Sequence, residues 1–283
     1  MINLLIGLLP AIIWGIMPVL LSITKGNPYI QLLGTTIGSF VFSSLLMLIL
    51  HPNFSLPGLG FGFLSGLCWS IGQFGQYYGY KTIGVSQVFT LSTSFQIVGN
   101  SLIAGLLLKE WNSTFAISKG IIAVIIIVIG IIFTSIKFNG KISSDKKAYL
   151  ILLFTTVGYW GYSLLPKFEN GSSVNIFFVQ TIGMLVSALI LSSVYLKKNI
   201  FKYKISLAKN CIPGLLFGSA AYIYLCSIQL NGIVKAFILS QVSVIIATLF
   251  GLYYFKDQKE GISIFRTYCG LVLILIGTVM IEF

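Results

Sequence analysis

Long apolar runs separated by short polar segments extend over the whole chain. Ten of these runs reach the length of about 20 residues that a helix needs to cross the hydrocarbon core of a bilayer. The predicted spans are residues 3–24, 30–50, 57–80, 86–108, 114–136, 148–166, 175–196, 211–230, 234–255 and 264–282. The pattern therefore predicts an all-α membrane protein with ten transmembrane helices.

The composition supports this class. Hydrophobic residues make up 57% of the chain and charged residues only 8%, whereas about 25% of the residues in a soluble domain are charged. The formal charge of +12 does not indicate a nucleic-acid partner, because the basic residues form no stripe on a polar face. The four cysteines show no metal-ligand spacing and are interpreted as small buried hydrophobes.

The basic residues predict the orientation in the cell membrane. Fourteen of the 18 lysines and arginines fall in the odd-numbered connections, and only Lys109, Lys119, Lys167 and Lys235 fall on the other side. Positive loops stay in the cytoplasm, so the basic loops are predicted to be cytoplasmic and both termini extracellular. The N-terminal run lacks a basic segment and a cleavage site, and we expect it to be retained as the first span.

The chain resembles itself at an offset of 146 to 150 residues. The repeated pairs are Trp14-Gly15 with Trp160-Gly161, QLLG at 31–34 with QTIG at 180–183, GVSQVFTLS from Gly84 with GIVKAFILS from Gly232, and KE at Lys109 with KD at Lys256. Five spans per half is an odd number, so the second half must be upside down relative to the first. Inverted repeats are typical of secondary transporters, which bind substrate near the membrane midplane between the repeats.

This repeat defines the predicted domains. Residues 1–137 form the first five-helix repeat, residues 138–147 a basic cytoplasmic linker, and residues 148–283 the second five-helix repeat. The predicted fold is thus ten transmembrane helices arranged as two inverted five-helix repeats.

Polar and aromatic residues recur at helical spacing within four of the spans. In the first half the stripes are Trp69, Gln73, Gln76 and Tyr80, and Phe89, Thr93, Gln96 and Asn100. At the same intervals their repeat partners in the second half give Gly218, Tyr222, Leu225 and Gln229, and Phe237, Gln241, Val244 and Thr248. Polar side chains that face lipid are costly, so these stripes must face protein or water. They either hydrogen-bond neighbouring helices or line a cavity, and the recurrence of amides together with aromatic rings favours the cavity.

Amides beside aromatic rings suit a sugar. Glutamine and asparagine both donate and accept hydrogen bonds, as sugar hydroxyls do, and the C–H face of a sugar stacks on an aromatic ring. Trp14, Trp69 and Trp160 are the candidates for stacking, although tryptophan is also a common anchor at the membrane interface.

Charged residues are absent from the middle of the predicted spans. Every acidic residue falls at a span end or in a loop: Glu110, Asp145, Glu169, Asp257, Glu260 and Glu282. This pattern argues against a drug antiporter with a buried glutamate and against an intramembrane proton relay. The absence of a mid-span cation likewise argues against a phosphorylated cargo. His51 has no catalytic or metal-binding partners in the sequence, so we expect no enzyme, no metal and no cofactor.

Several segments resemble the bacterial glucose/ribose uptake proteins of the drug/metabolite transporter superfamily. They are LLPAIIWG, GNPYIQLLGTTIGS, LSGLCWSIGQ, GVSQVFTLSTSFQIVGNSL and FILSQVSVIIATLFGLYYFKDQKEG. The resemblance implies a transporter with a ten-helix fold that imports a monosaccharide by proton symport. It does not choose between glucose and ribose, and facilitated diffusion stays open. A carrier or exporter of another small neutral metabolite, such as an amino acid, is the alternative.

The stripes, the repeat and the resemblance together give one set of candidate substrate-binding residues. They are Trp14, Gln31, Trp69, Gln73, Gln76, Thr93, Gln96, Asn100, Trp160, Gln180, Gln229 and Gln241. Pro10 and Pro18 flank Trp14 in the stretch LLPAIIWGIMP, and we expect a bent or broken helix there, beside the cavity.

Overall fold

Helices make up all the regular structure in the described part of the chain, which comprises residues 2–53, 59–135, 146–169, 171–196, 200–254 and 261–282 of a computed structural model. The α-helices are α1 (Ile2–Thr24), α2 (Pro28–Leu50), α3 (Gly60–Thr82), α4 (Val85–Leu102), α5 (Thr114–Ser135), α6 (Lys146–Leu164), α7 (Ser173–Leu196), α8 (Lys204–Asn231), α9 (Ile233–Gln241), α10 (Ser243–Tyr253) and α11 (Gly261–Glu282). A π-helical turn, η1 (Ile103–Leu107), follows α4. The 3₁₀ turn η2 (Leu165–Phe168) follows α6, and the 3₁₀ turn η3 (Ile200–Tyr203) precedes α8.

Seven helical segments among the described residues are long and apolar enough to cross a membrane. They are Ile2–Thr24, Pro28–Leu50, Thr114–Phe133, Lys146–Phe168, Ser173–Ser193, Lys204–Asn231 and Ile233–Gly251. Large apolar side chains also cover the outside of the bundle, and Phe115, Phe154 and Phe265 are each at least 70% exposed. An exterior of this kind is stable in lipid rather than in water, so this is a membrane protein.

The helix ends mostly lie within a few residues of the predicted span ends. The main difference is α8, which begins at Lys204 rather than at residue 211. Hydropathy detects only the apolar part of a helix, and the first turns of α8 carry Lys204 and Lys209. The predicted span 234–255 is divided at Val242 into α9 and α10.

The proline-rich first helix is not broken. Pro10 and Pro18 both lie inside α1, which stays α-helical from Ile2 to Thr24, and both prolines are buried. Gly15 allows close approach of α10, because a Cβ at this position would lie 2.7 Å from Cγ2 of Ile246. Each proline lacks the N–H group that would donate to a backbone carbonyl one turn earlier in α1. Neighbouring helices cover this part of α1. The second-half counterpart ends differently, because α6 changes to the 3₁₀ turn η2, which contains Pro166.

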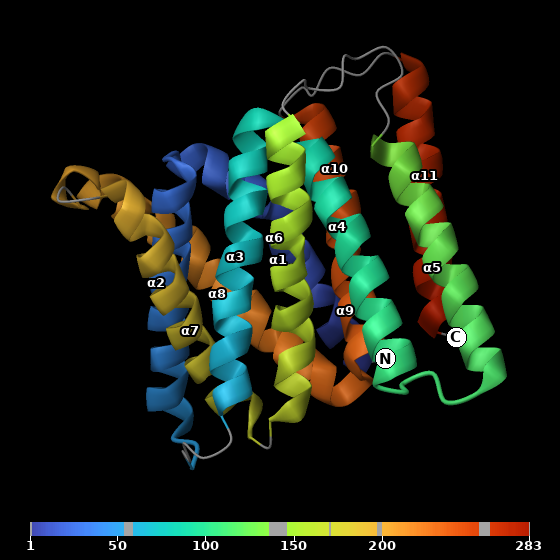
Figure 1. Cartoon of the computed structure of the whole chain (residues 1–283), viewed down its shortest axis with the longest axis horizontal. Coiled ribbons are helices and arrows are strands. Elements are labelled where there is room, and N and C mark those ends of the chain that lie inside the picture. Colours follow the sequence, from blue (N-terminus) through green and yellow to red (C-terminus); the bar gives the residue numbers. More distant parts are fainter. Residues whose placement is uncertain are drawn as a thin grey trace.

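The helices run side by side as a bundle in which the start of α1 and the end of α11 lie at the same end (Figure 1). The most extensive packing joins α2 to α8, α3 to both α6 and α7, α1 to α8, and α5 to α11. Glycines allow the closest of these contacts. Gly38 on α2 lies against the backbone of Gly214 on α8, and Gly66 on α3 lies against the backbone of Met184 on α7. Small residues permit such contacts where no hydrophobic force drives helices together.

Candidate functional site

A cavity lies in the centre of the bundle and contains about 610 Å³ of empty space, including the part open to solvent. Helices α1, α3, α4, α6, α8 and α9 and the first residue of α10 contribute to its wall. The lining residues are Trp14, Met17, Trp69, Gln73, Gln76, Tyr77, Tyr80, Phe89, Thr93, Gln96, Tyr159, Tyr162, Ser163, Phe217, Tyr224, Phe237, Gln241 and Ser243.

A hydrogen-bonded cluster of two amides and a phenol forms one part of this wall. Gln73 and Gln76 are three residues apart on α3, so their side chains share a face, and Nε2 of Gln73 donates to Oε1 of Gln76 at 3.1 Å. The hydroxyl of Tyr159, on α6, lies 3.0 Å from Oε1 of Gln73 and 3.2 Å from Oε1 of Gln76 and donates to them. All three side chains are buried.

Two further amides reach the cavity from α4 and α9. Nε2 of Gln96 donates to Oγ of Ser92 at 3.0 Å, and Nε2 of Gln241 donates to Oγ of Ser240 at 3.1 Å. In each case the serine lies on the same helix as the amide. Local bonds of this kind fix the amide without using its carbonyl oxygen.

Aromatic rings form the remainder of the wall. The ring centroid of Phe217 lies 4.5 Å from that of Trp69 and 6.0 Å from that of Trp14. The Tyr224 ring lies 5.4 Å from Trp14 and is stacked on Tyr162 at 6.1 Å. Nε1 of Trp14 and the hydroxyl of Tyr162 are buried and have no hydrogen-bond partner among the described residues. Both groups are therefore available to a ligand in the cavity.

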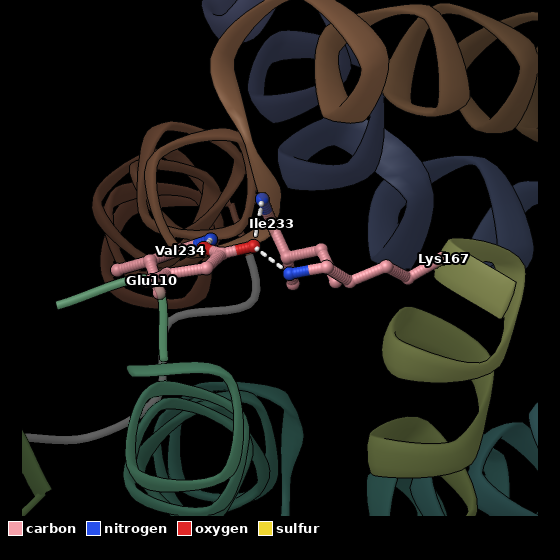
Figure 2. Close-up of polar contacts among 4 residues, drawn as sticks. All are labelled: Glu110, Lys167, Ile233 and Val234. Atoms are coloured by element: carbon pink, nitrogen blue, oxygen red, sulfur yellow. Dashed lines mark hydrogen bonds and ion pairs between the residues drawn. The ribbon is translucent and has the colours of Figure 1, made fainter. Parts of the chain in front are cut away.

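An ion pair with two additional hydrogen bonds joins three segments at one end of the bundle (Figure 2). Oε1 of Glu110, in the connection after η1, lies 2.9 Å from Nζ of Lys167 on η2. The same carboxylate accepts hydrogen bonds from the backbone N–H groups of Ile233 at 3.1 Å and Val234 at 2.9 Å. These two residues begin α9, whose N-terminus favours a negative charge. Glu110 thus joins the connection after η1 both to η2, which follows α6, and to the start of α9.

Seven of the twelve residues predicted from the sequence line the cavity: Trp14, Trp69, Gln73, Gln76, Thr93, Gln96 and Gln241. Gln31 and Gln180 do not. They occupy matching places on α2 and α7 and bond inside the helix packing. Nε2 of Gln31 donates to the carbonyl of Leu21 at 3.1 Å, and Nε2 of Gln180 donates to Oγ of Ser65 at 2.7 Å.

The other three predicted residues also lie outside the lining. Nε1 of Trp160 donates to the carbonyl of Phe95 at 2.9 Å, so this indole joins α6 to α4. Gln229 is exposed and accepts a hydrogen bond of 2.6 Å from Oγ of Ser173. Asn100 is buried, and neither polar atom of its side chain has a partner in the described part of the chain.

Most of the tyrosines that line the cavity are not among the residues predicted from the sequence. Tyr77, Tyr159, Tyr162 and Tyr224 are buried and line the cavity. A usable signal was present, because a buried phenol needs a hydrogen-bond partner and is therefore informative inside an apolar run. On α8 the predicted stripe began at Gly218, the position that matches the α3 stripe in the repeat. The residues of α8 that line the cavity are instead Phe217 and Tyr224, which are spaced i, i+7 on a neighbouring face.

The chain is similar to known sugar transport and uptake proteins over almost its whole length. Residues 5–283 match the family described as "Sugar transport protein". A Lactobacillus johnsonii protein named for sugar uptake is 38% identical over 277 residues, covering 96% of each chain. The Bacillus subtilis glucose uptake protein GlcU is 35% identical, covering 99% of this chain and 97% of that protein. A Latilactobacillus sakei protein named for ribose uptake, RbsU, is 34% identical, covering 98% and 96%.

The fold is also similar to one already solved. A crystal structure that shares 14% sequence identity superposes with a TM-score of 0.70, covering 98% of this chain and 95% of the other. This similarity concerns the fold alone.

Proposed function

This chain belongs to the sugar transport family, and from that premise we propose that it is a secondary transporter that imports a neutral monosaccharide across the cell membrane. The family and the relatives are transport and uptake proteins, not enzymes. The observation that carries the proposal is the central cavity, whose described lining combines amides and aromatic rings and contains no charged residue.

The chemistry of this lining suits a sugar. Gln73, Gln76, Gln96 and Gln241 offer donors and acceptors that hydroxyl groups can satisfy, and each neutral hydrogen bond contributes only about 1 kcal/mol net. A few such bonds give the weak, reversible binding that a carrier requires. The rings of Trp14 and Trp69 offer apolar faces for the C–H groups of the sugar. A phosphorylated or ionised cargo would leave its charge unpaired in this cavity.

We further propose ten membrane spans in two inverted repeats, residues 1–137 and 148–283, with residues 138–147 as linker. The packing supports this arrangement, because exchanging the two halves converts the contact of α2 with α8 into that of α7 with α3, and the contact of α1 with α8 into that of α6 with α3. Helices α3 and α4 are less apolar than the seven candidate spans because they supply much of the polar wall of the cavity. The linker residues 138–145 lie outside the described residues.

The orientation follows from charge, whereas proton coupling is what the resemblance to the glucose/ribose uptake proteins implies. The basic loops are proposed to be cytoplasmic, which puts both termini and Glu110 at the extracellular end. Import is proposed to be coupled to protons, and an experiment must distinguish this symport from facilitated diffusion.

Uptake into proteoliposomes tests the proposal. Purified protein should show saturable uptake of radiolabelled glucose or ribose, and accumulation should increase when the lumen is made alkaline relative to the outside. A radiolabelled neutral amino acid serves as the cargo control. Amino-acid flux without sugar flux would refute sugar import, and sugar flux that ignores the pH gradient would refute symport.

A further inference from the structure

We propose that Tyr159 is a positioning residue that makes the amide pair on α3 a hydrogen-bond donor toward the sugar. This inference rests on the proposed function and adds a rule of specificity: on this side of the cavity the transporter recognises a sugar oxygen mainly as an acceptor of hydrogen bonds.

The hydrogen bonds within the cluster support this polarity. Oε1 of Gln76 accepts from Nε2 of Gln73, and the Tyr159 hydroxyl hydrogen is shared between the carbonyl oxygens of both amides. A carbonyl oxygen has two acceptor positions, whereas each amide nitrogen has two N–H groups. Both acceptor positions of Gln76 Oε1 and one of Gln73 Oε1 are thus engaged inside the cluster. Both N–H groups of Gln76 and one of Gln73 remain for a ligand.

The reversed orientation of the amides is unfavourable. If the Gln76 amide alone were flipped, its NH₂ group would face the NH₂ group of Gln73, and if both amides were flipped, the hydroxyl hydrogen of Tyr159 would have no acceptor among the described residues. Either change leaves a donor unpaired in a site where Gln73 and Gln76 are each 7% exposed and Tyr159 is 6% exposed. Unpaired buried donors cost about 1 to 3 kcal/mol each, and little water can enter to replace the lost bond.

The backbone of α3 fixes the Tyr159 ring. Gly72 lies directly beneath it, and a Cβ at this position would lie 2.8 Å from the ring. The glycine allows α6 to approach α3 closely enough for the hydroxyl to reach both amides. The position of the phenol is therefore set by helix packing and does not depend on a bound ligand.

The amides on α4 and α9 supply acceptors. The nitrogens of Gln96 and Gln241 each donate to a serine on their own helix, and no described residue donates to their carbonyl oxygens. These oxygens remain as acceptors for the ligand. A sugar in the cavity would accept from α3 and donate to α4 and α9. The site thus distinguishes a sugar hydroxyl that accepts a hydrogen bond from one that donates it.

Competition with modified sugars tests the inference. A C–F group can accept a hydrogen bond weakly but cannot donate one, and a deoxy position can do neither. Monofluoro and monodeoxy analogues of glucose, or of ribose if ribose is the sugar transported, are used at each carbon to inhibit uptake. At one carbon at least, the fluoro analogue should inhibit almost as well as the parent sugar, while the deoxy analogue is about tenfold weaker.

Tyr159→Phe should reduce this fluoro-to-deoxy difference to about twofold, because the amides are then free to turn. The ratio of two inhibition constants within one variant is insensitive to expression and to a general loss of activity, so a merely structural role would leave it unchanged. Tyr149→Phe is the matched control, because Tyr149 is on the same helix, is not among the residues lining the cavity and has no hydroxyl partner among the described residues. This control should keep the full difference.

Two results would overturn the inference alone: fluoro analogues as weak as the deoxy analogues at every carbon, or an unchanged difference in Tyr159→Phe. Absence of any saturable sugar uptake would instead overturn the proposed function and this inference with it.

Discussion

Replacing Glu110 by glutamine should weaken the contacts that join the connection after η1 to η2 and α9. Glu110 accepts from Lys167, Ile233 and Val234 at 2.9, 3.1 and 2.9 Å. In the proposed transport cycle we expect these contacts to break when the cavity opens toward this end, because they join segments from both halves of the chain. Glutamine has nearly the same shape, but it has no charge and one acceptor oxygen fewer.

The size of the effect follows from these contacts. The amide oxygen of glutamine can serve one backbone N–H group, while its NH₂ group faces the other. The loss of one charge-assisted bond costs about 1.5 to 3 kcal/mol. The ion pair is partly exposed, at 36% for the Lys167 side chain and 17% for Glu110, and such a pair adds about 0.2 to 1 kcal/mol. A total of about 1.7 to 4 kcal/mol would shift the balance toward the open state by roughly 15- to 700-fold.

Thiol labelling measures this shift. In a variant without the native cysteines, Ser163→Cys places a single thiol in the cavity wall, and an impermeant maleimide is added from the side that carries Glu110. Labelling should be at least tenfold faster in Glu110→Gln and only slightly faster in Lys167→Gln, which loses the weaker ion pair. Lys119→Gln is the control, because Lys119 lies over the Phe115 ring. Equal labelling rates in Glu110→Gln and the parent would refute the reasoning.

Two other substitutions test the packing and the cavity. Gly66→Val should prevent folding to a monodisperse protein, measured by fluorescence-detected size-exclusion chromatography, because its Cβ would overlap the carbonyl oxygen of Gln180, whereas Gly60→Val, with nothing within 4 Å, should fold normally. Gln96→Leu should reach the membrane but lose at least tenfold in sugar uptake, since it removes a buried amide of the cavity wall, whereas Gln229→Leu, at an exposed position, should keep uptake within about twofold. A monodisperse Gly66→Val would contradict the packing argument, and wild-type kinetics in Gln96→Leu would make that amide structural.

The sequence predicted the helices well because apolar runs of membrane length have few alternative structures. It also predicted the cavity-facing side of α3 and α4, where polar residues are dense enough to define a helix face. Trp69, Gln73 and Gln76 on one helix and Thr93 and Gln96 on the other all reach the cavity. On α8 the few polar residues define no single face, so a register transferred from the repeat selected Gly218 instead of Phe217.

Contacts between distant segments could not be predicted from spacing. Glu110 bonds residues 57 and more than 120 positions away, and periodicity within one helix carries no information about such partners. The same holds for Gln31 and Gln180, whose amide nitrogens bond neighbouring segments of the chain. A glutamine in a span needs some partner, but the sequence does not specify which one.

The glycine contacts between α2 and α8 have a consequence for biosynthesis. Oγ of Ser39 donates to the carbonyl of Gly214 at 3.0 Å, across 175 positions of sequence. At about 5 to 20 residues per second, a ribosome needs on the order of ten to thirty seconds to make the intervening chain. During that interval α2 resides in the bilayer without α8 against its small-residue face, and it is stable there because its backbone hydrogen bonds are internal. The first half of the protein therefore acquires its packing against α8 only after translation has passed α8, and a chain released before that point would keep an unpaired, association-prone face of α2 in the membrane.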